Sequence, residues 1–227
     1  MKTLPTIAAI VPMRHASQRV PGKNYRAFAG KPLFHRIIEQ LLACSKITRV
    51  IIDTDSETIL DDARRHFPTV KLLRRPAHLC ADTLPMNDVL LNVMEQVEAE
   101  FYIQTHCTNP LLSSSTIGRA IDQFLAHYPA YDSLFSVTRM QTRLWDGLAR
   151  AINHNPSILL RTQDLPPVYE ENSCLYLFRK STLAECHNRI GQRPLMFEID
   201  RMEAIDIDEE HDFHVAELLC LHTRNES

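Results

Sequence analysis

Short apolar runs alternate with amphipathic stretches along this chain. The runs at 7–11, 50–52, 70–73, 101–103 and 133–138 are brief and rich in β-branched or aromatic residues, which is typical of buried strands. Between them, stretches at 33–42, 57–66, 85–97 and 116–126 follow the periodicity or the capping pattern of helices. Strands that alternate with helices of this length predict an α/β fold with a doubly wound, mainly parallel sheet.

Residues 139–170 break this alternation. The segment contains Trp145 and prolines at 156, 166 and 167, and it shows no sustained period. We interpret it as an extended excursion from the sheet, which either covers the mouth of the site or reaches a partner subunit. A further strand at 174–178, a short helix from Ser181 and a closing helix at 212–222 complete the expected fold. Residues 1–227 are expected to form one domain.

Composition narrows the functional classes. With a formal net charge of −3, the chain lacks the basic character expected of a nucleic-acid-binding protein, so any phosphate site must be local. The six cysteines form no CxxC pair and are expected to be reduced thiols in a cytoplasmic protein. The first residues do not have the pattern expected of a signal peptide, and no apolar run reaches about 18 residues, so neither a signal peptide nor a membrane span is predicted.

A basic loop follows the first predicted strand. It carries Arg14, Arg19 and Lys23 together with Ser17 and Asn24. In open α/β sheets, ligands bind beyond the carboxyl ends of the strands, so cations and small residues here favour a polyphosphate ligand. The spacing is neither that of a P-loop nor that of a dinucleotide-binding turn. A solvated surface loop with ordinary Lys and Arg residues remains an alternative.

Two carboxylates alternate with isoleucines near the end of the chain, in Ile205-Asp206-Ile207-Asp208. In an extended segment the two Asp side chains share one face, roughly 7 Å apart. Such carboxylates repel each other unless a cation lies near them, and their hard oxygen atoms suit Mg²⁺. The alternative is that one or both Asp residues cap the final helix.

A third polar group includes Arg161, Gln163, Tyr169 and Asn172. Polar side chains concentrated beside a proline-flanked excursion indicate a polyhydroxylated or carboxylated substrate, for which Arg is a bidentate partner. Ordinary solvated loop polarity explains them equally well.

Six motifs, in order along almost the entire chain, resemble those of the acylneuraminate cytidylyltransferase (CMP-sialic acid synthetase) family, which is close to the CMP-Kdo synthetases. They are VPMRHASQRVPGKNYRAFAGKPL, IDTDSETI, RRPAHLCADT, QTHCTNPLL, ENSCLYLF and IDIDEEHDF. The resemblance implies a nucleotide-diphospho-sugar transferase-like fold that transfers CMP from Mg-CTP to a hydroxyl of an acidic sugar and releases pyrophosphate. It also implies a homodimer in which residues 139–170 cross to the neighbouring subunit.

The resemblance also assigns roles by position. Arg14, Lys23 and Asp208 would be catalytic, and Asp206 and Asp208 would bind Mg²⁺, one of them helping to activate the attacking hydroxyl. The residues expected beside the nucleotide are Arg14, Ser17, Lys23, Asn24, Arg75, Asp82 and Thr105. Those expected beside the sugar acid are Gln104, Arg161, Gln163, Tyr169 and Asn172.

The chain departs from the family pattern in the loops expected to face the substrate. His15-Ala16 replace a pair of glycines, residues 106–110 replace a Pro-Thr-Ser-Pro sequence, and Asn172-Ser173 replace Asn-Gly. The acceptor is therefore open between sialic acid, another nonulosonic acid, a Kdo-like acid and a phosphonate. A nucleotidyltransferase specific for another base and a non-catalytic nucleotide-binding module of the same fold are further alternatives.

Overall fold

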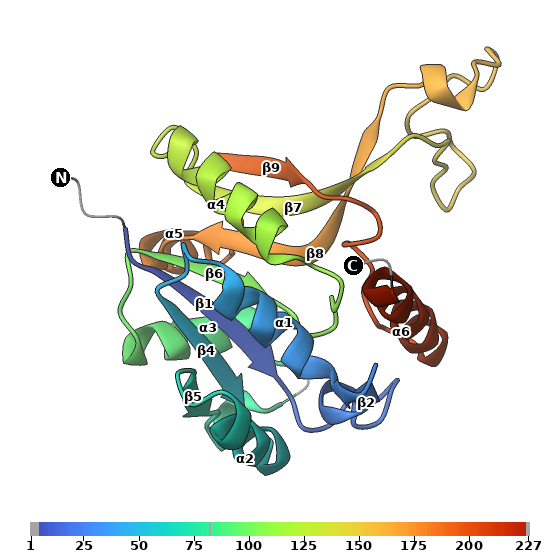
Figure 1. Ribbon diagram of the computed structural model, residues 1–227. Helices are drawn as coiled ribbons and strands as arrows, with labels where there is room; N and C mark the ends of the chain where they lie inside the picture. Colours follow the sequence, from blue (N-terminus) through green and yellow to red (C-terminus); the bar gives the residue numbers. More distant parts are fainter. Residues whose placement is uncertain (1–4, 82, 226–227) are drawn as a thin grey trace.

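The computed structural model describes residues 5–81 and 83–225, which contain a central sheet with helices on both faces (Figure 1). Its strands are β1 (Ile7–Met13), β4 (Arg49–Thr54), β5 (Lys71–Arg74), β6 (Phe101–Thr105), β7 (Ser133–Met140), β8 (Val168–Phe178) and β9 (Pro194–Glu198). They lie in the order β5-β4-β1-β6-β8-β7-β9. Of these strands, β8 runs antiparallel to both its neighbours, whereas the other neighbouring pairs are parallel. The predicted mainly parallel α/β sheet is confirmed.

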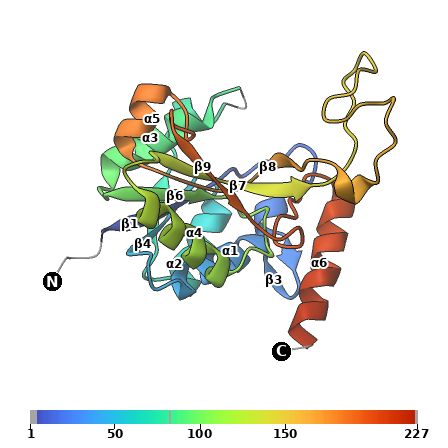
Figure 2. The same ribbon diagram turned by 90° about the horizontal axis from the view of Figure 1, so that it is seen from above.

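Strand β1 is apolar throughout because both of its faces are buried. Ile7 and Val11 pack with α1 (Leu33–Ala43), α2 (Glu57–His66) and α4 (Ser114–His127). Ala8 and Ile10 face the opposite side, where α3 (Met86–Gln96) and α5 (Lys180–Cys186) supply apolar side chains. Figure 2 shows these two helical layers with the sheet between them. The continuous apolar run of β1 is thus the pattern of a central strand covered on both faces.

A third apolar cluster joins the two ends of the chain. Val20 and Phe28 come from the loop after β1, which contains the short helix η1 (Lys23–Tyr25) and the hairpin β2 (Ala27–Phe28) and β3 (Lys31–Pro32). They pack with Ile207 and with Phe213 of helix α6 (Glu210–Asn225). The rings of Phe28 and Phe213 meet edge to face, with their centroids 5.5 Å apart. This packing brings the acidic C-terminal motif to the basic N-terminal loop.

Residues 141–167, the projecting segment, extend away from the sheet between β7 and β8 (Figure 1). The segment contains a short helix, η3 (Thr162–Asp164), and an isolated bridge between Trp145 and Ala151. Several of its large apolar side chains are exposed, including Leu148 at 75% and Leu159 at 90%.

Two strands of the sheet differ from those expected. Strand β8 begins at Val168 rather than at residue 174, because its first half pairs with the end of β7. Strand β9 was not predicted from the sequence. Of its side chains Phe197 is buried, at 4% exposure, so the strand lacks a distinctive apolar run.

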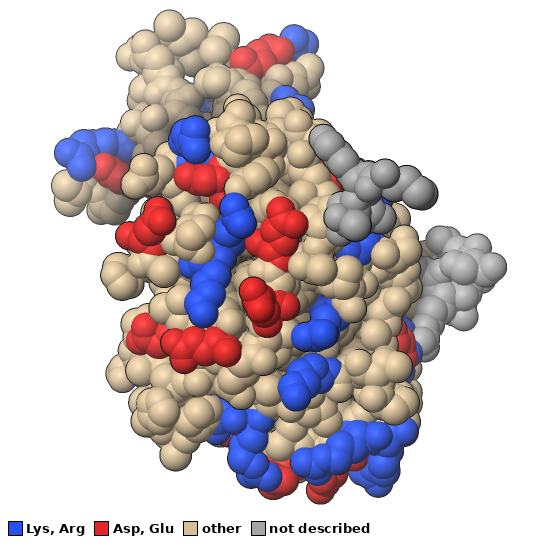
Figure 3. Space-filling model, turned by 90° about the vertical axis from the view of Figure 1, so that its left-hand side faces the viewer, with Lys and Arg blue, Asp and Glu red and all other residues tan. Residues whose placement is uncertain are grey.

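The described surface gives two further observations. On the face seen in Figure 3, Lys and Arg side chains are interspersed with Asp and Glu side chains over most of the surface and gather toward its lower edge. Among the described residues, no helix combines the length and apolar character needed to cross a membrane.

Candidate functional site

A cavity of about 480 Å³ lies where the loops after β1 and β6 meet. In the sheet, β4 and β5 lie on one side of β1, and β6, which comes later in the chain, lies on its other side. Ligands of doubly wound folds bind at such a reversal of strand order. The cavity is lined by Arg14, Ser17, Lys23 and Asn24 from the first loop and by residues 106–108 from the second.

The first loop is held in place by its own polar groups. Gly22 has a φ of 66°, a left-handed conformation that favours glycine, and it starts helix η1. Asn24 Nδ2 donates to the Arg14 carbonyl at 2.8 Å, and Cys107 Sγ donates to Asn24 Oδ1 at 3.0 Å. Burial raises the pKa of Cys107 to about 12, so it remains a neutral donor. The structure thus brings Arg14, Lys23 and Asn24 together.

His15 fixes the same loop from outside the cavity. Its backbone N–H donates to Asp55 Oδ1 at 2.7 Å, its Nδ1 lies 2.8 Å from Ser56 Oγ, and its ring stacks on Tyr25. This residue, which replaces an expected glycine, therefore ties the loop to the start of α2. The contacts support a positional role for His15 in this loop.

Lys23 and Arg19 connect the basic loop to the acidic motif. The buried Lys23 Nζ donates to the carbonyl of Ile207, whose own N–H donates to the Thr108 carbonyl at 2.9 Å. Arg19 Nη2 donates to Asp208 Oδ1 at 2.6 Å. The loop after β1, the loop after β6 and the acidic motif therefore form one site.

The acidic motif has the donor set that a hard cation requires. Asp206 Oδ1 is buried and has no hydrogen-bond partner among the described residues. Burial raises the pKa of Asp206, and the nearby charge of Asp208 raises it further. An orphaned carboxylate oxygen beside a second carboxylate fits Mg²⁺, which takes oxygen ligands. The residues present therefore match the predicted metal.

The local structure of this motif differs from the prediction in one respect. Residues 205–208 are irregular rather than strand-like; Ile207 is buried, whereas Ile205, Asp206 and Asp208 are half-buried. The carboxylate that accepts the N–H groups of Asp208 and Glu209 is that of Asp212, at 3.1 and 2.7 Å. Asp212, in the first turn of α6, thus accepts the N–H groups of the two residues that precede the helix, and the Asp208 side chain faces Arg19.

A second cavity, of about 850 Å³, adjoins the acidic motif. Asn172 lies in its lining together with Asp206, Asp208 and Arg201. The Asn172 amide is fixed by two hydroxyl groups, since Oδ1 accepts from Ser136 Oγ at 2.6 Å and Nδ2 donates to Thr138 Oγ1 at 2.9 Å. Both Asp residues border this cavity, and Asp208 also contacts Arg19, which lines the smaller cavity, so the two cavities are neighbours.

Gln104 lies beneath the site and is fully buried. Its amide nitrogen lies 2.8 Å from His106 Nε2, and its oxygen accepts from Arg189, whose guanidinium stacks 3.9 Å from the Tyr176 ring centroid. Burial, with Arg189 and Lys23 nearby, lowers the pKa of His106 to about 4, so this imidazole is neutral at physiological pH. Gln104, predicted to face the sugar acid, therefore lines neither cavity and contacts His106 of the smaller one.

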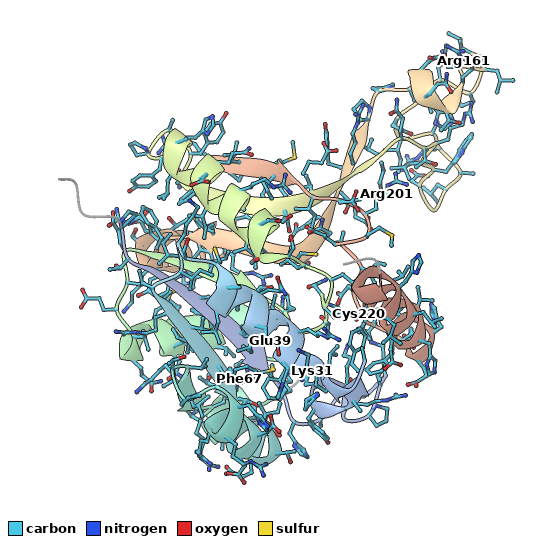
Figure 4. All side chains as sticks on the ribbon, viewed as in Figure 1. Lys31, Glu39, Phe67, Arg161, Arg201 and Cys220 are labelled. Carbon is cyan, nitrogen blue, oxygen red and sulfur yellow. The ribbon has the colours of Figure 1, made fainter. Side chains whose placement is uncertain are left out.

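Other predicted residues lie outside these cavities. Arg161 pairs with Asp164, at 2.7 and 3.0 Å, near the end of the projecting segment, far from Arg201 at its base (Figure 4). Gln163 belongs to the same exposed helix, and Tyr169, at the start of β8, is 43% exposed. Within this chain the structure does not bring these three residues to the acidic motif.

Arg75 and Thr105, both predicted to lie beside the nucleotide, are buried in the fold and line neither cavity. The Arg75 side chain is buried, and its Nε lies 2.6 Å from Asp53 Oδ2, so the guanidinium is used inside the fold. Thr105 is fully buried on β6. Asp82 lies outside the described residues.

Arg19, His106 and Arg189 were not assigned roles from the sequence. Arg19 was visible as a cation in the basic loop, whereas Arg189 stands in an irregular segment after α5 that offers no signal. Their positions follow from contacts between segments distant in sequence.

Comparison with known proteins agrees with this geometry. The family model described as "Cytidylyltransferase" matches residues 8–222. The pseudaminic acid cytidylyltransferase of Campylobacter jejuni is 25% identical, over 92% of this chain and 94% of its own length. The CMP-N,N'-diacetyllegionaminic acid synthase of Legionella pneumophila is 27% identical, over 94% of this chain and 95% of its own.

Solved structures share the fold. The structure of CMP:2-keto-3-deoxy-manno-octonic acid synthetase complexed with CTP superimposes with a TM-score of 0.73, covering 96% of this chain and 99% of the other, at 15% identity. A 4-diphosphocytidyl-2C-methyl-D-erythritol synthase gives a TM-score of 0.68 at 16% identity, covering 95% and 98%. The predictions of this fold and of a nucleotidyltransferase are confirmed, and the chain belongs to the cytidylyltransferase family.

Proposed function

We propose that this enzyme transfers CMP from CTP to a hydroxyl of an acidic sugar, sialic acid or a related nonulosonic acid, and releases pyrophosphate. The names of its relatives, which refer to pseudaminic and legionaminic acid, support this acceptor class. The observation that carries the proposal is the pair of contacts from Lys23 to Ile207 and from Arg19 to Asp208. These contacts unite a cationic loop and a paired carboxylate at one cavity edge.

The cationic cavity supplies the electrostatic part of the reaction. Attack at the α-phosphorus drives negative charge onto the leaving pyrophosphate, so fixed cations lower the barrier when they are already in position. Lys23 is buried and anchored, and Ser17 and Asn24 add hydrogen-bonding groups beside it and Arg14. The hydrogen bonds of Lys23 to Ile207 and of Asn24 to Arg14 hold the loop in place before substrate binds. Little reorganisation of the loop is therefore needed to reach the transition state.

Asp206 and Asp208 would hold Mg²⁺, consistent with the unpartnered Asp206 Oδ1. Bound Mg²⁺ would neutralise phosphate charge and orient the phosphate oxygens. The two carboxylates themselves require a nearby cation in order to remain ionised together, and Arg19 supplies one of the compensating charges.

The larger cavity is the proposed acceptor compartment. Asn172 is held in a fixed orientation by Ser136 and Thr138, so its amide can select among sugar hydroxyl and acylamino groups. Arg201 in the same lining offers a partner for the acceptor carboxylate. The acidic motif between the compartments then faces both reactants.

We also propose a homodimer formed through residues 139–170. The exposed Leu148, Ile158 and Leu159 of the projecting segment support this, since such apolar side chains gain free energy when a second subunit covers them. In the dimer, Arg161 and Gln163 would serve the acceptor site of the neighbouring subunit.

A cytoplasmic location is proposed on separate grounds. All six cysteines are free thiols in the structure, and four of them are buried. Free thiols are typical of a reducing compartment such as the cytoplasm.

A pyrophosphate-release assay tests the reaction. The enzyme is incubated with CTP, Mg²⁺ and, separately, sialic, legionaminic, pseudaminic and Kdo-type acids, and the Lys23→Met variant is run in parallel. Release that requires both CTP and a nonulosonic acid, and falls in Lys23→Met by roughly a hundredfold or more, supports the proposal. CTP binding without release for any acceptor would instead indicate a non-catalytic nucleotide-binding module.

A further inference from the structure

Helices α1 and α2 share a cluster of three potential metal ligands outside the active site. The cluster consists of His35 on α1 and of Asp62 and His66 on α2. His35 Nε2 lies 2.5 Å from Asp62 Oδ1, and His66 Nδ1 lies 3.3 Å from the same oxygen. One ligand atom from each residue falls within 4.8 Å of the others. Three donors thus converge from two helices.

The local fold explains this convergence. Asp62 and His66 are four residues apart, so they project from the same face of α2. The His35 ring is held by edge-to-face contacts with Phe34 and Phe67, at centroid distances of 4.6 and 4.7 Å. Phe67 directly follows α2, beside the sheet (Figure 4). One imidazole is therefore preorganised in the core, while the other two groups lie at the helix surface.

The donor set selects a class of metal. Two imidazole nitrogens and one carboxylate oxygen suit Zn²⁺ and neighbouring divalent transition ions better than Mg²⁺ or Ca²⁺, which prefer oxygen ligands throughout. Ligands of a tetrahedral Zn²⁺ ion, with bonds of about 2.0–2.2 Å, lie roughly 3.3 Å apart. The present separations require small side-chain movements to reach that arrangement.

The surroundings favour a cation as well. His66 lies in the last turn of α2, where the carbonyl end of the helix attracts positive charge. The side chains of Asp62 and His66 are 20% and 54% exposed, whereas that of His35 is 7% exposed. Solvent can therefore reach the cluster from one side, which gives an ion an entry path and leaves a position for water.

We propose that His35, Asp62 and His66 form a transition-metal site of the Zn²⁺ class that clamps α1 to α2. Helix α1 starts directly after the hairpin that ends the basic loop, and α2 starts after β4. A metal bound across the two helices stabilises the native state because the unfolded chain does not hold the three ligands together. The proposal is independent of the acceptor and of the reaction.

Zn²⁺ titration of the tag-free full chain, in buffer with excess Mg²⁺ to fill oxygen-ligand sites, tests the proposal. The variants are His66→Ala and Asp62→Asn, since both side chains are partly exposed and the folds should persist. His127→Ala is a matched control because His127 is also exposed and its Nδ1 contacts the carbonyl four residues earlier, as His66 does. Calorimetry measures affinity, and thermal unfolding measures stabilisation.

We expect one Zn²⁺ bound per chain by the wild type and by His127→Ala, with affinity lower by at least about tenfold in His66→Ala and Asp62→Asn. At a Zn²⁺ concentration a hundredfold above Kd, the midpoint of thermal unfolding should rise by about 5–10 °C in the wild type. Equal Zn²⁺ affinity in the wild type and both cluster variants, or no binding to the wild type, would overturn the proposal.

Discussion

Arg19 and Asp208 are separated by 189 residues, yet Arg19 Nη2 lies 2.6 Å from Asp208 Oδ1. Both side chains are about half exposed, so the ion pair contributes at most about 1 kcal/mol to stability. Its importance is positional, because it places a cation between the proposed nucleotide cavity and the proposed metal ligands.

Arg19→Gln should therefore impair nucleotide use more than stability. We expect the KM for CTP to rise by about tenfold and the unfolding midpoint to change by no more than about 4 °C. Arg26→Gln is the matched control, since Arg26 also joins the N-terminal loop to α6, through Glu210 at 2.8 Å, but lines neither of the two site cavities. Steady-state kinetics on both variants decide the point, and an unchanged KM in Arg19→Gln would remove Arg19 from the site.

Removing one carboxylate of the acidic motif should abolish most turnover. Asp208→Asn keeps the size of the side chain but loses a charged oxygen ligand, so kcat should fall by roughly a hundredfold and the Mg²⁺ concentration for half-maximal rate should rise. Asp61→Asn, which alters an exposed partner of Arg64, serves as control. A normal Mg²⁺ titration curve in Asp208→Asn would contradict the metal assignment.

His106 should make the fold sensitive to acid. Its pKa is lowered by burial to about 4 from an ordinary value of 6.5, so between these pH values the unfolded chain binds a proton that the folded chain does not. Stability should fall by roughly 2–3 kcal/mol as the pH drops from 6.5 to 4. Urea unfolding at a series of pH values measures this loss of stability, which should be smaller in His106→Gln. An identical dependence of stability on pH in the wild type and the variant would show that His106 is not its cause.

The proposed association of two subunits can be tested independently of the folding of each subunit. Leu159 is 90% exposed in the projecting segment, so Leu159→Arg should leave the unfolding midpoint of the subunit nearly unchanged while weakening association. Leu218→Arg, at an exposed position on α6, is the control. Sedimentation at micromolar concentration should give a dimer for the wild type and the control and a monomer for Leu159→Arg. A wild-type monomer would refute the dimer.

The sequence predicted the sheet and its binding edge because these depend on local patterns. Burial of β1 on both faces requires the apolar run 7–11, and the loop after a central strand must carry the ligand groups. The alternation in 205–208 predicted one face for the two Asp side chains and the other for the two isoleucines; the segment is not a strand, and of the two isoleucines only Ile207 is fully buried.

What the sequence could not predict depends on pairing between distant segments. The sequence around Arg75 does not show whether its side chain binds phosphate or pairs with the buried Asp53. Strand β9 joins the sheet through backbone pairing with β7, and its own sequence has no apolar pattern that predicts a strand. Arg161 and Gln163 stood out as polar groups, but the projecting segment takes them away from the acidic motif of their own chain.

The most direct test of the account is ³¹P nuclear magnetic resonance of the complete reaction with CTP, Mg²⁺ and a nonulosonic acid. The account predicts that the three CTP phosphorus signals disappear and are replaced by one phosphodiester signal of a CMP-sugar and one pyrophosphate signal of twice its intensity, since the two products form in equal molar amounts and pyrophosphate has two equivalent phosphorus atoms. Release of CMP or CDP without a phosphodiester, or unchanged CTP with every acidic sugar tried, would contradict it.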